Sequence, residues 1–70
     1  MKNSQIMQAT HTANDPHNAI LMYLELGHLA GMNGNSEEAI DYYIKGLQIA
    51  REIQDKPRVQ QLSNLILTYI

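Results

Sequence analysis

The stretch that decides the fold spans residues 23–43 and reads YLELGHLAGMNGNSEEAIDYY. Its centre, residues 31–35, is rich in Gly and Asn, and both residue types accept the positive φ angles of tight turns. Asn35 and Ser36 can each cap the helix that follows, and Glu38 completes a capping box if Asn35 is the cap. The stretch therefore predicts two helices joined by a short turn.

The first of these helices is predicted over residues 16–32. Asp15 can accept hydrogen bonds from free backbone N–H groups, and Pro16 suits the first helical position because no N–H donor is needed there. Small and apolar side chains recur at steps of three and four residues, which places them on one face. They are Ala19, Ile20, Tyr23, Leu26, Gly27 and Ala30.

Two further helices are predicted, over residues 36–54 and 57–70. The helix over 36–54 has its own apolar face, made of Ala39, Ile40, Tyr43, Gly46, Leu47, Ala50 and Ile53. The helix over 57–70 begins at a proline, whose preceding residue avoids the α conformation. Its stripe is Val59, Leu62, Leu65, Ile66, Tyr69 and Ile70. No segment alternates as a half-buried strand does, so the fold class is all-α, with three antiparallel helices.

Composition limits the remaining possibilities. The 70 residues make one small domain at most, and the absence of cysteine excludes disulfides and Cys-based metal sites. A net charge of −2 argues against a nucleic-acid binder, and no apolar run is long enough for a membrane span. We expect a cytoplasmic protein without a leader peptide, with a flexible N-terminal arm over residues 1–14 and a helical domain over 15–70.

No group of side chains predicts catalysis. The carboxylates of Glu37 and Glu38 are neighbours on a helix and so point apart. His11, Asp15 and His17 lie close together along the chain, but their spacing matches no zinc signature. The sequence therefore predicts a protein that is not an enzyme and that holds no metal and no cofactor.

Six residues of the deciding stretch stand at the spacings of a known helical motif. They are Tyr23, Leu26, Gly27, Gly34, Ala39 and Tyr43. On these residues the chain resembles the tetratricopeptide repeat, a helix-turn-helix unit that stacks into solenoids. The chain departs from the pattern in having Ala30 where Tyr is usual, Gly46 where Ala is usual, and Arg51 where Pro is usual.

A partial second copy of the motif follows at an offset of 39 residues. The pattern Tyr23-x-x-Leu26-Gly27-x-x-Ala30 is similar to Leu62-x-x-Leu65-Ile66-x-x-Tyr69. With this spacing the chain resembles a longer variant of the repeat, of about 40 residues. The resemblance implies about one and a half repeats, in which a helix-turn-helix unit is followed by an extra C-terminal helix.

A second stripe on the first helix predicts a partner-binding surface, because its side chains recur at helical spacing roughly opposite the core face. The resemblance implies that this side lines a concave groove that holds peptides, with polar guides from the third helix. The predicted groove residues are Leu21, Leu24, His28, Met32, Gln60 and Asn64.

The third helix lacks the partner that would follow it in a longer array. Leu62, Ile66, Tyr69 and Ile70 are therefore predicted to form an oligomer interface. Leaving a Leu or Ile exposed forfeits about 1.5–3 kcal/mol, so a small domain gains much by covering such a surface. A two-fold homodimer would cover it in both copies at once.

Two functions remain open. One is a protein–protein interaction module, a small adaptor, chaperone-like or regulatory protein that docks a peptide or helix through its groove and open third helix. The alternative is a self-assembling structural protein whose apolar faces serve only homodimerisation. A DNA-binding regulator would need base-reading cations on an exposed helix face, where the second helix offers only Lys45 and Arg51. We therefore expect a protein or peptide partner, with no nucleic acid and no membrane.

Overall fold

The computed structural model describes residues 15–70, and these residues form three α-helices and no β-strand. The helices are α2 (Pro16–Met32), α3 (Ser36–Glu52) and α4 (Lys56–Thr68). The predicted all-α class with three helices is confirmed. The predicted arm over residues 1–14, and His11 with it, lie outside the described residues.

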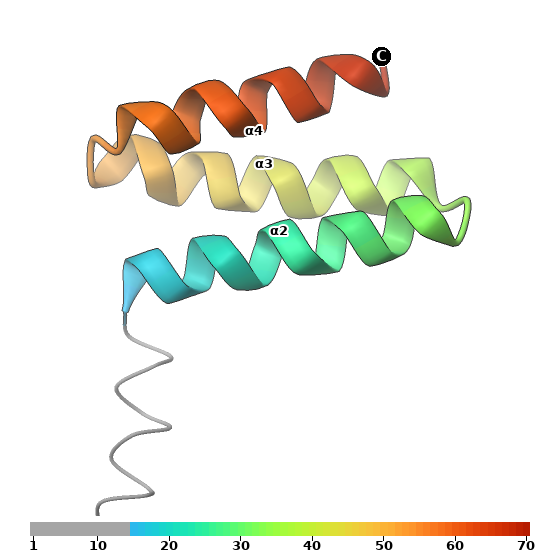
Figure 1. Cartoon of the computed structure of the whole chain (residues 1–70), viewed down its shortest axis with the longest axis horizontal. Helices are drawn as coiled ribbons and strands as arrows, with labels where there is room; N and C mark the ends of the chain where they lie inside the picture. Colours follow the sequence, from blue (N-terminus) through green and yellow to red (C-terminus); the bar gives the residue numbers. More distant parts are fainter. Residues whose placement is uncertain (1–14) are drawn as a thin grey trace, which may run out of the picture.

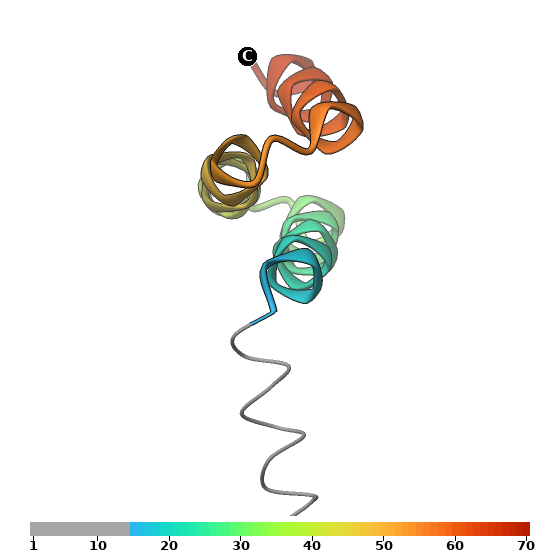
Figure 2. The same ribbon diagram turned by 90° about the vertical axis from the view of Figure 1, so that its left-hand side faces the viewer.

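The three helices run antiparallel to their neighbours in the chain, with α3 between α2 and α4 (Figure 1). Seen along the helices, α2 and α4 lie on the same side and α3 is displaced to the other side (Figure 2). Consequently α3 packs on both of the other helices, and it supplies three of the five buried small residues in the described part of the chain, Ala39, Gly46 and Ala50. Small side chains let helix axes approach closely, which lets large side chains fill the space between them.

The first and last helices start in the same way. Oδ1 of Asp15 accepts a hydrogen bond from the His17 backbone N–H at 3.0 Å, and Oδ1 of Asp55 accepts one from the Arg58 N–H at 3.3 Å. Each of these caps precedes a proline in the first helical turn, where a missing N–H has no cost. Both starts therefore follow from an Asp and a Pro one or two residues apart.

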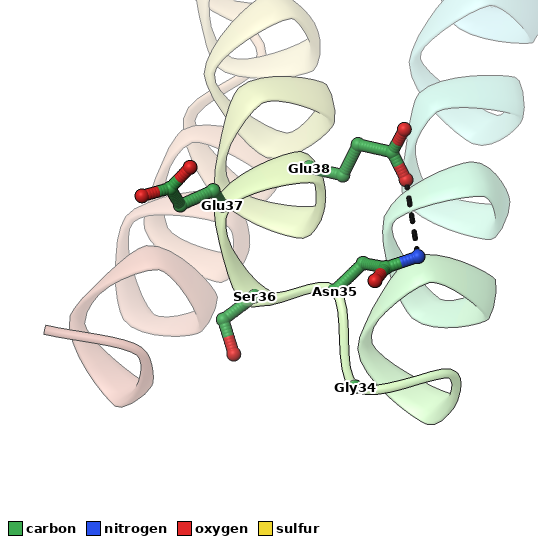
Figure 3. Close-up of a pocket in the computed structure, with 5 residues that line it drawn as sticks. All are labelled: Gly34, Asn35, Ser36, Glu37 and Glu38. Carbon is green, nitrogen blue, oxygen red and sulfur yellow. Dashed lines mark hydrogen bonds between the residues drawn. The ribbon is translucent and has the colours of Figure 1, made fainter.

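The start of α3 differs from the capping box that the sequence predicts. Asn35 is the N-cap residue, but its side chain makes no hydrogen bond to the backbone N–H groups of α3. Its Nδ2 donates instead to Oε1 of Glu38, at a long 3.5 Å (Figure 3). Two acidic residues in the first turn, Glu37 and Glu38, favour the positive end of this helix.

The turn between α2 and α3 has the backbone hydrogen bonds of a Schellman motif. The N–H of Gly34 donates to the carbonyl of Gly31 at 3.1 Å, and the N–H of Asn35 donates to the carbonyl of Ala30 at 2.8 Å. Gly34 has a φ of 81°, a left-handed conformation that glycine adopts without a steric penalty. The turn ends α2 at the predicted residue.

The turn between α3 and α4 repeats this hydrogen-bond pattern without a glycine. The N–H of Gln54 donates to the carbonyl of Arg51 at 3.1 Å, and the N–H of Asp55 donates to the carbonyl of Ala50 at 2.9 Å. Gln54 has a φ of 57°, so it stands in the left-handed region. Because that conformation ends a helix, α3 stops at Glu52, two residues before the predicted end.

Replacing Gln54 by glycine is expected to stabilise the protein by about 0.5–1 kcal/mol. A left-handed conformation costs an L-residue about 1–2 kcal/mol, and glycine avoids this cost. Part of the advantage is lost because glycine gives the unfolded chain more conformational entropy. Urea unfolding followed by circular dichroism measures the difference. The exposed Gln48→Gly variant, in the middle of α3, is the control, and it should lose about 1 kcal/mol. A destabilised Gln54→Gly variant would contradict the left-handed turn.

Candidate functional site

The predicted groove stripe of α2 is largely exposed, with one exception. Leu21, His28 and Met32 face solvent, Met32 with 81% of its surface exposed. Leu24 is 6% exposed and belongs to the core, so its predicted place in a binding groove is wrong. The reason is its position on the helix: Leu24 stands between buried Ile20 and buried Gly27, at steps of four and three residues.

The exposed stripe lies on the side of α2 that faces α4. Nδ1 of His17, one turn before Leu21, is 3.8 Å from Oδ2 of Asp55 at the start of α4. At the other end of α2, a Cβ on Gly31 would collide with the hydroxyl of Tyr69, and it would be 3.2 Å from Cζ of that ring. On α4 itself, the predicted polar guides Gln60 and Asn64 are exposed.

His28 is held in place by the backbone of its own helix. Its Nδ1 is 2.7 Å from the carbonyl oxygen of Leu24, and since a carbonyl only accepts, Nδ1 donates. In the neutral ring, Nε2 is then an acceptor. The ring also meets Tyr43 edge-on, with centroids 5.7 Å apart and an interplanar angle of 83°. His28 therefore presents a fixed acceptor beside the buried aromatic side chains.

Two tyrosines from α3 and α4 pack against two glycines of α2. The ring of Tyr43 lies where a side chain on Gly27 would be, and the hydroxyl of Tyr69 lies where one on Gly31 would be. The two rings are 6.1 Å apart between centroids. The sequence analysis treats Gly31 as part of the turn and does not predict this contact. Gly27 and Gly31 are four residues apart and share a helix face, a spacing that leaves room for large neighbouring side chains.

Burial raises the pKa of the Tyr43 hydroxyl above its ordinary value, and the nearby Tyr69 hydroxyl raises it further. A raised tyrosine pKa stabilises the folded state at every pH below the pKa of the unfolded chain, about 10. We therefore expect the free energy of unfolding to fall as the pH rises from about 10 through the higher folded-state pKa of Tyr43.

Urea unfolding at pH 8 and at pH 11 tests this pH dependence. The Tyr43→Phe variant should lose less stability between the two pH values than the unmodified protein, because it has no hydroxyl to ionise there. Tyr42→Phe, on the same helix but with a half-buried ring, is the matched control. Equal losses in the Tyr43→Phe variant and the unmodified protein would contradict the assignment.

The predicted oligomer interface on α4 is used mostly inside the molecule. Leu62 has no exposed surface and packs in the core beside Gly46, so its predicted role as an open interface residue is wrong. Ile66 and Tyr69 are half-buried, and both pack against the core cluster. Because α3 offers a row of small residues, α4 turns its apolar stripe toward α3. Ile70 alone of the four is exposed, at 87%.

A different set of aliphatic side chains is exposed at the α3–α4 end of the molecule. Ile44 of α3 is 39% exposed and Leu67 of α4 is 66% exposed. We call these two residues, with Ile70, the C-terminal end surface. Ile44 and Arg51 are seven residues apart and share a face of α3, as Gln60 and Leu67 share a face of α4.

An open hollow joins these two faces. It has a volume of about 590 Å³ and is lined by Arg51 and Gln54 from the end of α3, and by Lys56, Val59 and Gln60 from α4. The rows of α3 and α4 that carry Ile44 and Leu67 therefore flank the same side of the molecule. Two cationic side chains, Arg51 and Lys56, lie at one edge of that side.

A second open hollow lies at the turn between α2 and α3, lined by five consecutive residues, Gly34 to Glu38 (Figure 3). The side chains of Glu37 and Glu38 point in different directions from α3, as the sequence predicts. Within residues 15–70, no three potential ligands from His, Asp and Glu come together to hold a metal ion. The candidate pair of Asp15 and His17 makes a capping bond instead.

No helix within the described part of the chain is both long and apolar enough to cross a membrane. No protein-family model, no curated protein and no solved structure matches this chain.

Proposed function

We propose that this chain is a cytoplasmic protein-interaction module, without enzymatic activity, that binds a helical segment of a partner protein at its C-terminal end surface. One observation carries the proposal: Ile44, Leu67 and Ile70 are aliphatic side chains that the fold leaves in water. Burying an exposed side chain of this size contributes about 1.5–3 kcal/mol, and Leu67 and Ile70 are exposed over most of their surface. An amphipathic helix is the usual occupant of such a surface, because it supplies apolar anchors at steps of three and four residues.

The burial pattern supports a repeat origin for this surface. At the offset of 39 residues, the inward-facing Ile20 and Gly27 of α2 correspond to Val59 and Ile66 of α4, which pack inward. The exposed His28 corresponds to the exposed Leu67. We propose on this basis that α2 and α4 are the first helices of two successive tetratricopeptide-like repeats. The C-terminal end surface is then the place where a following helix would pack.

The charge at the far end of this side of the molecule specifies the partner further. Arg51 and Lys56 line the hollow at the α3–α4 turn, at the opposite end of α4 from Leu67 and Ile70 (Figure 1), and no acidic side chain lines the hollow. Charges at the rim of an interface select partners of opposite sign and affect the association rate more than the affinity. The proposed partner is therefore an amphipathic helix that runs along α4 from Leu67 to the hollow and carries Asp or Glu at the end that lies over the hollow.

An array of synthetic amphipathic helical peptides tests the proposal with the full-length chain. The peptides share one apolar stripe and differ only in flanking Glu or flanking Lys. We expect the Glu-flanked peptides to bind and the Lys-flanked peptides to bind more weakly. Leu67→Glu should abolish binding, and reversing both cations by Arg51→Glu with Lys56→Glu should reverse the preference.

The control for this experiment is Asn18→Glu, which adds one acidic residue to an exposed position of α2, on the other side of α3 from α4 (Figure 1) and so away from the surface. Its binding and its helical circular dichroism should match those of the unmodified protein. Binding of no peptide, or equal binding by Leu67→Glu, would contradict the proposal.

The alternative function, self-assembly, uses the same exposed side chains. Ile70 and Leu67 lie near the end of α4, where two copies could meet around a two-fold axis. Sedimentation at micromolar concentration separates the two functions. A dimer that Leu67→Glu converts to a monomer, together with no peptide binding, favours self-assembly.

A further inference from the structure

A second apolar surface lies at the opposite end of the molecule, on the flank of α2 that faces away from α3. Met22 and Leu29 are seven residues apart, which places them on one face of α2, and they are 48% and 50% exposed. Asn18, one turn before Met22, and Glu25, between Met22 and Leu29, stand in the same row and are also exposed. We call these four residues the outer face of α2. No other described helix packs on this flank (Figure 2).

The apolar character of the outer face is specific to α2. At the offset of 39 residues, Met22, Glu25 and Leu29 correspond to Gln61, Asn64 and Thr68 of α4, all of which are polar and exposed. The corresponding row of α4 is therefore suited to water. The row on α2 carries two large apolar side chains in its place, and a segment that packed on this row would bury them.

We propose that residues 1–14 of this chain pack along the outer face of α2 and bury Met22 and Leu29. This segment joins α2 directly at the N-cap Asp15, and it carries two adjacent large apolar residues, Ile6 and Met7. Seven peptide units separate Met7 from Asn14, and an extended chain of that length spans about 23–25 Å. The whole of α2 is about 25 Å long, so Ile6 and Met7 can reach either Met22 or Leu29.

Charge favours this segment over a second copy of the chain. Glu25 is the only Asp, Glu, Lys or Arg in α2, and it lies in the middle of the outer face. Two copies of α2 packed antiparallel across this face would bring two Glu25 carboxylates together in an apolar contact, which is costly. Residues 1–14 carry Lys2 and no acidic residue, so they can offer Glu25 an opposite charge.

The covalent connection also favours the segment. A tethered segment meets its surface at a millimolar effective concentration when the linker is short, so a weak contact suffices to hold it. A separate chain would have to supply the full cost of association. The inference is independent of the proposed function, because it concerns the opposite end of the molecule.

Cysteine cross-linking tests the inference directly, since the chain contains no cysteine. Full-length variants carry Met7→Cys together with Met22→Cys or Leu29→Cys, and the control carries Met7→Cys together with Gln48→Cys on the exposed face of α3. We expect an intramolecular disulfide to form on the order of tenfold faster, or more, in the α2 variants than in the control. Equal rates would overturn the inference, and so would disulfides that form only between chains.

Thermal unfolding gives a second readout that does not depend on cysteine. Ile6→Glu with Met7→Glu removes both apolar side chains, whereas Gln5→Glu with Gln8→Glu adds the same charge and keeps them. We expect the first pair to melt about 4–8 °C below the second, the shift that a loss of 1 kcal/mol gives in a small domain. Equal melting temperatures would overturn the inference. Peptide binding at the C-terminal end surface should be the same in both pairs, so failure here is distinguishable from failure of the proposed function.

Discussion

Replacing Leu62 by alanine is expected to lower the free energy of unfolding by about 2–5 kcal/mol. Leu62 has no exposed surface and is one of the three largest fully buried side chains of the described residues. A Cβ on Gly46 would be 3.4 Å from Cδ2 of Leu62, so α4 rests on α3 at this point. Alanine would leave a cavity that two helices can close only in part. Since small domains have only about 5–15 kcal/mol of stability, the loss is a large share of the total.

Urea unfolding followed by far-ultraviolet circular dichroism measures the effect, and Leu67→Ala is the matched control. Leu67 is in the same helix and is 66% exposed, so its replacement should change stability by less than about 0.5 kcal/mol. If the two variants were equally stable, the rotation of α4 about its axis would differ from the one described.

The positions of the helices could be predicted from local sequence signals. Asp15 with Pro16 starts α2, and Asp55 with Pro57 starts α4, each through a side-chain oxygen that caps the helix. Gly34 ends α2 because its left-handed conformation needs no Cβ. The end of α3 was predicted two residues too late because Gln54, a residue type with no preference for that conformation, occupies the corresponding place.

The faces of the helices could be predicted only in part. A helical pattern gives the centre of the buried face, but its width depends on how many neighbours a helix has. The sequence places Leu24 in a groove because it predicts one narrow buried stripe on α2, whereas Leu24 is buried with Ile20 and Gly27 on a wider face. Leu62 was assigned to an open interface because the sequence does not show toward which neighbour α4 turns.

The exposed residues of the candidate surfaces could not be predicted for the same reason. Neither Leu67 nor Ile44 is among the groove or interface residues that the sequence predicts. Their exposure depends on how far α3 and α4 cover each other, which is a property of packing. Ile70, at the end of the apolar stripe, is 87% exposed, and its place in an oligomer interface stays a prediction.

Replacing Gly27 by leucine is expected to destabilise the protein by about 1–3 kcal/mol. In an exposed helix the same change would gain up to about 1 kcal/mol, because glycine is a poor helix former. Here a Cβ on residue 27 would be 2.8 Å from both Cδ1 and Cζ of the Tyr43 ring, and nearer still to Cε1. The ring cannot move away cheaply, since it is 1% exposed and has His28 and Tyr69 as aromatic neighbours.

The sign of the change therefore tests whether α2 and α3 cross closely at Gly27. The measurement is the urea unfolding midpoint at neutral pH, and the double variant Gly27→Leu with Tyr43→Ala supplies the control. Removing the ring opens the space that the new side chain needs, so the two changes together should cost less than the sum of each alone. A Gly27→Leu variant as stable as the unmodified protein would mean that residue 27 faces open space. It would also contradict the close contact between Gly27 of α2 and the buried ring of Tyr43 of α3.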